Sequence, residues 1–231
     1  MAFTSNKTLA QTKYNRTKCA NRKTNKSVDN LVIHYTGTQA SARNNCLYFG
    51  SGNRSASADY FIDKDGACYK FNKYVNTGYS WHCGDGGGKY GITNARSIGF
   101  EVVSAGEAFT VKQIKKLKAA VRYFRKYYKK DIPVVRHYDA SRKVCPAPYA
   151  GSAAKDQKWK DLLKQIDETY VAKSDCYTYS RRYWGKRYRK RSIKKGKEIC
   201  IVSTFQGAKY LWGTTVEGDY INLTKSFKSK Y

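Results

Sequence analysis

The sequence has no long hydrophobic run. None of its apolar stretches approaches the roughly 18 consecutive residues that a helix needs to cross a bilayer. The N-terminal stretch also lacks the apolar core of a secretory signal peptide. We therefore expect a chain without a transmembrane segment that is made in the cytoplasm. If it works beyond the membrane, another route must release it.

Acidic residues are scarce. The 231 residues include 17 Asp and Glu against 45 Lys and Arg, which gives a formal net charge of +28. Such an excess favours a polyanionic partner, namely nucleic acid, anionic lipid headgroups or the teichoic-acid-bearing wall of a Gram-positive bacterium. Net charge alone does not choose among these three partners.

Paired cysteines are missing as well. The seven cysteines are odd in number and contain no CxxC pair, which argues against a disulfide framework and favours synthesis in a reducing compartment. A single cysteine is usually a small buried hydrophobe. Only Cys145 stands in a motif that indicates another role.

That motif lies in the stretch Val134–Pro148, VVRHYDASRKVCPAP. A short β-branched run leads to His137, which we expect at the end of a buried strand. Two prolines follow Cys145 closely and stop regular structure, so its loop can fold back toward that strand end. Imidazole and thiolate are ligands that zinc favours, but zinc needs at least three ligands from the protein.

A second strand-end histidine is a candidate for the third ligand. The apolar run Leu31–Ile33 predicts a buried strand that delivers His34 into a Thr/Gly loop. A lone histidine in such a place is more often a core residue, but its match to His137 favours a shared site. Glu101 lies among apolar neighbours in a further expected strand, Ser97–Val103. A bare buried carboxylate is costly, so Glu101 is either paired or functional.

The remaining patterns predict an α/β domain. Residues 1–28 are polar and basic, and we expect an irregular lead-in there. Aromatic residues before a glycine-rich loop at 84–88 suit the wall of a binding groove and do not match a phosphate-binding loop. Turn residues and apolar spacing predict a helix over 39–50, a hairpin over 58–71 with its turn at Lys64–Gly66, a helix over 111–128 with Thr110 as N-cap, and a helix over 155–170.

The composition shifts after about residue 172. Residues 173–231 hold 15 Lys or Arg and 4 Asp or Glu, and they interleave Tyr, Trp and Arg, which can stack on bases or sugar rings. Short strand-like pieces are expected at 199–204, 209–214 and 219–223. This part is predicted to be a small β-rich binding module.

Three pieces of sequence together resemble one family. They are His34 after an apolar strand, Ser97-Ile98-Gly99-x-Glu101, and His137-x-Asp139-x3-Lys143-x-Cys145-Pro146. This ordered set resembles the zinc-dependent N-acetylmuramoyl-L-alanine amidases of type 2, which include phage endolysins and peptidoglycan recognition proteins. The resemblance covers about residues 28–170, and it is to the endolysins of phages that infect Gram-positive bacteria in particular.

The resemblance implies a fold and a domain plan. Residues 1–172 would form an α/β catalytic domain, a central mixed β-sheet flanked by helices. Residues 173–231 would form a cationic, aromatic-rich domain that binds the cell wall. The end of that domain, Tyr210–Gly213 and Gly218–Leu223, is similar to bacterial SH3-like modules.

The resemblance also implies an activity, namely hydrolysis by zinc-activated water of the amide between N-acetylmuramic acid and the L-alanine of the stem peptide. His34, His137 and Cys145 would bind Zn²⁺, Glu101 would be the general base, and Lys143 would stabilise the oxyanion. Some members use a tyrosine where this chain has Ala58, so proton transfer falls more heavily on Glu101. Thr36, Trp81, His82 and Asp139 are the expected substrate-binding residues, although Asp139 could instead hold the turn or orient a ligand histidine.

The expected partners are bacterial peptidoglycan and Gram-positive wall polymers, with no nucleic acid. The chain is expected to be a monomer released through a holin-made lesion.

Two alternatives remain. A recognition module would bind peptidoglycan without cutting it, and would need a disabled zinc set or no general base. A nucleic-acid-binding protein would bind in a salt-dependent and zinc-independent way, and would leave the His, Cys and Glu set unexplained.

Overall fold

The computed structural model describes residues 19–21, 28–51, 56–72, 75 and 78–231. Most of the expected lead-in over residues 1–28 lies outside the described residues. Within it, β1 (Cys19–Asn21) is a strand that pairs with β5 (Gly78–Ser80), so that short piece is not irregular as expected. None of the helices in the described ranges combines the length and the apolar character needed to span a bilayer.

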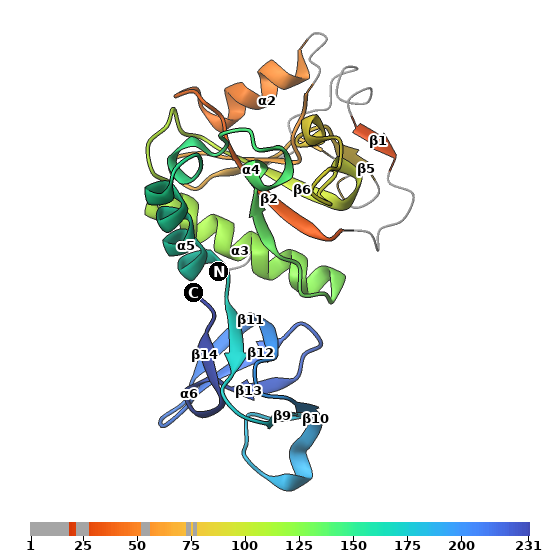
Figure 1. The fold of residues 1–231 in the computed structure, drawn as a ribbon, viewed down its shortest axis with the longest axis vertical. Coiled ribbons are helices and arrows are strands. Elements are labelled where there is room, and N and C mark those ends of the chain that lie inside the picture. Colours follow the sequence, from red (N-terminus) through yellow and green to blue (C-terminus); the bar gives the residue numbers. More distant parts are fainter. Residues whose placement is uncertain (1–18, 22–27, 52–55, 73–74, 76–77) are drawn as a thin grey trace. The chain divides into compact units, whose positions relative to one another are not determined.

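The chain divides into two compact units, one of residues up to 117 with 132–159, and one of residues 118–131 with 160–231. The first unit is built on a five-stranded mixed sheet in the order β4-β3-β6-β2-β7, as the sequence predicts (Figure 1). Four strands run parallel and β4 is antiparallel to β3. The strands are β2 (Asn30–Tyr35), β3 (Tyr60–Ile62), β4 (Cys68–Lys70), β6 (Ser97–Val102) and β7 (Val134–Arg136).

The register of this sheet decides where the functional side chains lie. Strand β2 pairs with β6 so that His34 stands opposite Glu101. On its other side β2 pairs with β7, with Ile33 opposite Arg136. His34 follows Ile33, and His137 follows Arg136. Because the two strands are parallel, both histidines lie near the same edge of the sheet.

The helices are α2 (Ala42–Gly50), α3 (Val111–Tyr128), α4 (His137–Ser141) and α5 (Ala153–Ile166). The hydroxyl of Thr110 accepts a hydrogen bond from the Gln113 amide at 3.2 Å, so Thr110 is the N-cap predicted for α3. The expected helix over 155–170 is wrong at its C-terminal end. Residues Thr169–Ala172 form β8, which pairs with two other strands and thereby satisfies backbone groups that a longer helix would take.

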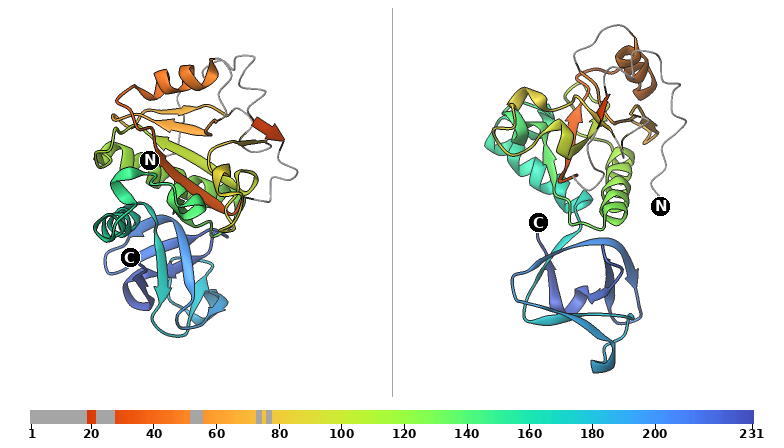
Figure 2. Two further views of the ribbon diagram at one scale, coloured as in Figure 1. Left: turned by 45° about the horizontal axis from the view of Figure 1, so that its top comes forward. Right: turned by 90° about the vertical axis from the view of Figure 1, so that its right-hand side faces the viewer.

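The second unit contains a seven-stranded sheet in the order β10-β9-β13-β12-β11-β8-β14, and Figure 2 shows its strands wrapped around a common interior. Its core consists of Ala172, Ile193, Ile199, Ile201, Ile221, Leu223 and Phe227. The expected β-rich C-terminal part is therefore present. The SH3-like type and the boundary at residue 172 stay predictions, and β8 belongs to this sheet. The further strands are β9 (Cys176–Tyr179), β10 (Arg189–Ile193), β11 (Glu198–Gln206), β12 (Leu211–Thr215), β13 (Tyr220–Asn222) and β14 (Phe227–Ser229).

A buried ion pair lies in the second unit. Arg125 Nη2 is 2.9 Å from Asp167 Oδ1, and the two side chains are 1% and 2% exposed. The hydroxyl of Thr169 donates to the same carboxylate oxygen at 2.5 Å. Because neither charged group reaches water, each depends on the other for its stability.

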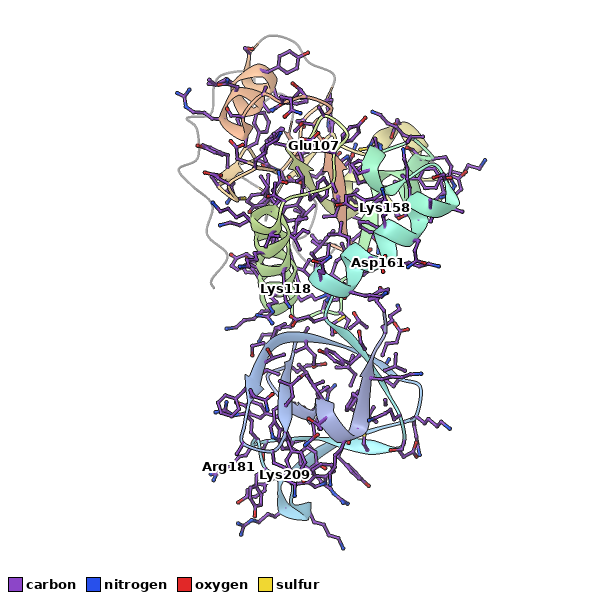
Figure 3. All side chains as sticks on the ribbon, turned by 90° about the vertical axis from the view of Figure 1, so that its left-hand side faces the viewer. Glu107, Lys118, Lys158, Asp161, Arg181 and Lys209 are labelled. Atoms are coloured by element: carbon purple, nitrogen blue, oxygen red, sulfur yellow. The ribbon has the colours of Figure 1, made fainter. Side chains whose placement is uncertain are left out.

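We expect Asp167→Asn to destabilise the second unit by about 3–5 kcal/mol, since it leaves the Arg125 charge buried without its counter-ion. The measurement is urea unfolding of the full chain followed by circular dichroism. Asp161→Asn is the control, because it breaks the Lys164–Asp161 pair, whose side chains are about half exposed (Figure 3), and should change stability by less than about 1 kcal/mol. Equal effects of the two substitutions would contradict this account.

Candidate active site and metal centre

A cavity of about 300 Å³ lies at the C-terminal edge of β2 and β6. Its lining includes His34, Glu101, His137, Lys143 and Cys145. A second hollow of about 440 Å³ shares some of these residues and is also lined by Trp81 and Asp85. The two hollows adjoin, because Trp81, His82, His137 and Lys143 line both, and we call them together the groove.

Three of these side chains form a cluster suited to a metal ion. One ligand atom from each of His34, His137 and Cys145 lies within 4.8 Å of the others, and all three residues are buried. Cys145 Sγ is 3.8 Å from His34 Nδ1. The Cys145 loop is held in place because the Tyr138 amide donates to the Cys145 carbonyl at 2.8 Å. The peptide bond between Cys145 and Pro146 is cis.

Each ligand histidine has a partner for its other ring nitrogen. His137 Nε2 lies 2.7 Å from Asp85 Oδ1, which comes from the short 3-10 helix η2 (Gly84–Gly86). A side chain on Gly86 would lie 2.0 Å from the Ala140 carbonyl oxygen, so a glycine is needed for η2 to approach α4 this closely. The Asp85 carboxylate accepts a hydrogen bond from the Nε2–H group of His137. The Nδ1 lone pair of His137 is then available to a metal.

A chain of hydrogen bonds fixes His34 in the same way. His34 Nε2 lies 3.0 Å from His82 Nδ1, and His82 Nε2 lies 3.1 Å from Ser97 Oγ. The Ser97 hydroxyl donates to the Thr93 carbonyl at 2.6 Å, so its oxygen accepts the His82 proton. His82 Nδ1 then accepts from His34, which leaves the His34 Nδ1 lone pair toward Cys145. A side chain on Gly99 would lie 2.6 Å from the His82 ring, so Gly99 makes room for this chain.

Burial keeps the three ligands uncharged. Burial lowers the pKa of His34 well below its usual value, and the neighbouring His82, His137 and Lys143 act in the same direction. Burial also lowers the pKa of His137, although Asp85 opposes this effect. Burial raises the pKa of the Cys145 thiol to about 12, with Glu101 acting in the same direction. Neutral imidazoles can bind a cation through a free lone pair. A bound cation would also favour the thiolate form of Cys145, which burial alone disfavours.

Glu101 lies beside this cluster. Its Oε1 atom is 3.8 Å from His34 Nδ1, and the side chain is 15% exposed. Burial raises the pKa of Glu101 to about 8, while the nearby Lys143 ammonium lowers it. Among the described residues, its Oε2 atom is buried and has no hydrogen-bond partner. A buried oxygen without a partner at the edge of a cavity is well suited to bind a proton of a ligand in that cavity.

The structure brings most of the expected site residues together. Thr36, Trp81 and His82 line the cavity with the five residues above. Asp139 is not in the cavity lining, because its carboxylate accepts from the Arg136 amide at 2.8 Å and pairs with the Arg136 guanidinium at 2.9 Å. These contacts brace the first turn of α4. Two residues after Ala58, Tyr60 is buried, stacks on Phe100 and is not part of the cavity lining.

The sequence reasoning missed two residues of the site, Asp85 and Ser97. Asp85 is the acid within the glycine-rich loop that follows His82, and this position was the signal that could have identified it. Ser97 begins the strand that carries Glu101, but nothing in its neighbours indicated that it would contact a histidine ring.

The chain is similar to known proteins. The family model described as N-acetylmuramoyl-L-alanine amidase matches residues 24–148. The N-acetylmuramoyl-L-alanine amidase CwlL of Bacillus licheniformis is 24% identical over 227 residues, which cover 88% of this chain and 61% of that protein. This chain therefore spans less than two thirds of the length of that relative.

Two solved structures share the fold. The structure of PlyL matches with a TM-score of 0.55 at 22% identity, over 72% of this chain and 97% of that chain. The solution structure of the PlyG catalytic domain matches with a TM-score of 0.50 at 24% identity, over 65% of this chain and 85% of that chain. Since the family model matches more than half of the 231 residues, the chain belongs to the N-acetylmuramoyl-L-alanine amidase family, of the type 2 that the sequence resembles.

Proposed function

We propose that the chain hydrolyses the amide between N-acetylmuramic acid and the L-alanine of the peptidoglycan stem peptide, with zinc as its cofactor. One observation carries the proposal. A single cavity is lined by three buried metal-ligand side chains and by a carboxylate, one oxygen of which has no hydrogen-bond partner among the residues that the structure describes. Membership of the amidase family supports the choice of bond.

The residues present fit a zinc ion. Two imidazoles and one thiol are a donor set that zinc favours, and three protein ligands leave a position for water or substrate. His34, His137 and Cys145 would hold the ion, and both imidazoles would bind it through Nδ1, because their Nε2 atoms are engaged by His82 and Asp85. When bound, zinc supplies a Lewis acid that acidifies water and polarises a carbonyl.

The protein side chains move the proton and stabilise the charge. Glu101 takes a proton from the attacking water and passes it to the leaving nitrogen, so that the carbonyl carbon gains an oxygen and L-alanine leaves with a free amino group. Lys143, whose exposed side chain lines the same cavity, stabilises the negative charge that develops on the carbonyl oxygen. Trp81, 38% exposed on the groove, and Thr36 contact the substrate.

His82 acts as a positioning residue for His34. It was expected to contact substrate, but both of its ring nitrogens contact protein groups and its side chain is buried among them. Through Ser97 it holds the proton of His34 on Nε2, which is the tautomer that presents Nδ1 to the ion. Asp139 holds the α4 turn through Arg136.

We expect His82→Ala to weaken zinc binding by roughly 10–100-fold, which is typical for loss of a partner that orients a metal ligand. Zinc affinity is measured by competition with a chromophoric chelator. Gly99→Ala should weaken binding in the same direction, since its methyl group would displace the His82 ring. Trp81→Ala is the matched control, because it should raise the KM for wall fragments and leave zinc affinity unchanged. If His82→Ala binds zinc like the wild type, His82 does not position His34.

We also propose that the C-terminal part, expected over residues 173–231, keeps the enzyme at a Gram-positive wall, while the part expected over residues 1–172 carries the catalysis. The sequence of the C-terminal part is strongly basic and rich in Tyr and Trp. Such a surface favours anionic polymers that also carry sugars.

The test of the proposed function is digestion of purified Gram-positive walls by the full chain, with and without a zinc chelator. We expect new L-alanine amino termini, no new reducing sugar ends, and loss of both digestion and bound zinc after chelation. Wall binding without any cleaved bond would indicate a recognition protein. New reducing ends would indicate a glycosidase and would overturn the assignment.

A further inference from the structure

The acidic side chains of residues 173–231 are all engaged by basic neighbours. This segment contains four carboxylates, and each forms at least one salt bridge of 3.0 Å or less. The pairs are Asp175 with Lys194 at 2.7 Å, Asp219 with Lys190 at 2.8 Å, Glu198 with Lys230 at 2.8 Å and Glu217 with Arg191 at 3.0 Å. The remaining basic residues of the segment are therefore not neutralised by its own acids.

Four of the remaining basic residues are arginines that lie on aromatic rings. Arg182 lies 3.9 Å from the centroid of Phe205, Arg189 lies 4.3 Å from that of Tyr177, and Arg187 and Arg181 lie 4.8 and 5.6 Å from that of Tyr188. All four side chains are exposed. Within the described residues, none of them forms a salt bridge with a carboxylate. We call these four residues the arginine face.

The arginine face belongs to one short stretch of chain. Arg181 and Arg182 follow β9, Arg187 lies in the 3-10 helix η5 (Lys186–Tyr188), and Arg189 is the first residue of β10. In Figure 3, Arg181 and Lys209 lie toward the same end of the β-rich unit. Lys225, which is distant in sequence, adds a further cation near this stretch. Its Nζ atom lies 5.2 Å from the ring centroid of Trp184 and 5.3 Å from that of Tyr210. Positive charge is thus concentrated around residues 181–189.

Stacking prepares these arginines for a phosphate group. A guanidinium that rests on a ring has lost part of its side-chain freedom before any ligand binds, so less entropy is lost on binding. The donors of a guanidinium form a planar fork that matches two phosphate oxygens. Several exposed guanidiniums within one short stretch of chain therefore suit a polymer that presents phosphate groups at intervals.

We propose that the arginine face binds the phosphodiester groups of teichoic acid in the Gram-positive wall. The proposal rests on the proposed wall function, and it adds the ligand chemistry and the residues. The polymer is a flexible polyanion with one phosphate per repeating unit, so several guanidiniums can each bind a separate phosphate. The sugar-peptide network itself lacks such phosphates, and it is the substrate of the other unit.

The test measures co-sedimentation of the full chain with Gram-positive walls, all variants carrying Glu101→Gln so that the walls stay intact. The first variant replaces Arg181, Arg182, Arg187 and Arg189 by Gln, and the second replaces the same four residues by Lys. The matched control replaces Lys194, Lys195, Lys197 and Lys228 by Gln, which removes the same charge from elsewhere in the segment. Walls are used before and after acid extraction of their teichoic acid.

We expect the four-Gln variant to lose wall affinity by at least about tenfold, the four-Lys variant to recover only part of it, and the lysine control to stay close to the parent chain. Extracted walls should bind the parent chain as weakly as intact walls bind the four-Gln variant. The four-Lys variant keeps the net charge and cation–ring contacts, so it separates loss of the planar fork from loss of folding.

Three outcomes would overturn the proposal: equal loss in the lysine control, undiminished binding to extracted walls, or competition by double-stranded DNA that exceeds competition by soluble teichoic acid at equal phosphate. The last would favour nucleic acid as the partner. Hydrolysis by the unsubstituted chain is a separate measurement, so a failed arginine face and a failed amidase assignment give different results.

Discussion

The chain with Glu101→Gln should lose hydrolysis of walls by at least about 100-fold while it retains zinc. A positioned general base contributes roughly 10²–10⁴-fold to such a reaction, and the amide of glutamine cannot accept the proton of the attacking water. Glutamine has nearly the same shape, and Glu101 is not one of the three clustered ligands, so the zinc content should be unchanged. The measurements are the rate of appearance of L-alanine amino termini and the zinc content of the purified protein.

Glu107→Gln is the matched control. Glu107 is exposed, pairs with Lys64 at 2.8 Å, and does not line the cavity (Figure 3). It undergoes the same chemical change outside the site, and its rate should match the wild type. A Glu101→Gln chain that keeps more than about a tenth of the wild-type rate would mean that another group accepts the proton.

Replacing Cys145 by serine should remove zinc as well as activity. A serine hydroxyl has a far higher pKa than a thiol, so it does not ionise beside the metal as a thiol does. The two histidines are neutral, and the site would therefore lose its negatively charged ligand. We expect zinc affinity to fall by more than the roughly 10–100-fold that loss of an orienting partner causes. The measurement is zinc affinity by chelator competition, together with wall digestion at saturating zinc.

Cys176→Ser controls for the chemical change itself. Cys176 lies in β9 of the other unit and is a free thiol of intermediate exposure. It should leave both zinc affinity and digestion unchanged. The contrast between the two cysteine variants separates a ligand effect from a general effect of removing a thiol. Full zinc affinity in the Cys145→Ser chain would be incompatible with a thiolate ligand.

The features set by local pattern could be predicted from the sequence. Apolar runs located the strands that end near His34 and His137, and the spacing of apolar residues located α3 together with its cap, Thr110. Parallel strands place their ends at one edge of a sheet. The metal ligands and Glu101 could therefore be expected in one place from the order of strands and residues in the chain.

The contacts made by loops could not be predicted in this way. Asp85 reaches His137 because Gly86 lets η2 approach α4, and no periodicity encodes that approach. The role of His82 depends on a serine on a different strand. The end of α5 was misplaced because strand pairing of Thr169–Ala172 overrides the helical pattern. Each of these depends on chain segments that are distant in sequence.

The pairing of β2 with β7 has a consequence for the making of the protein. Strand β2 comes early in the chain, yet its neighbour β7 and the Cys145 loop come late, and Cys145 lies 111 residues after His34. A nascent chain that ends before β7 has only His34 of the three clustered side chains, and the edge of β2 that pairs with β7 is still unpaired. The cluster of His34, His137 and Cys145 therefore comes together only after most of the first unit has been synthesised. A translation product that stops before His137 contains only one of these three side chains.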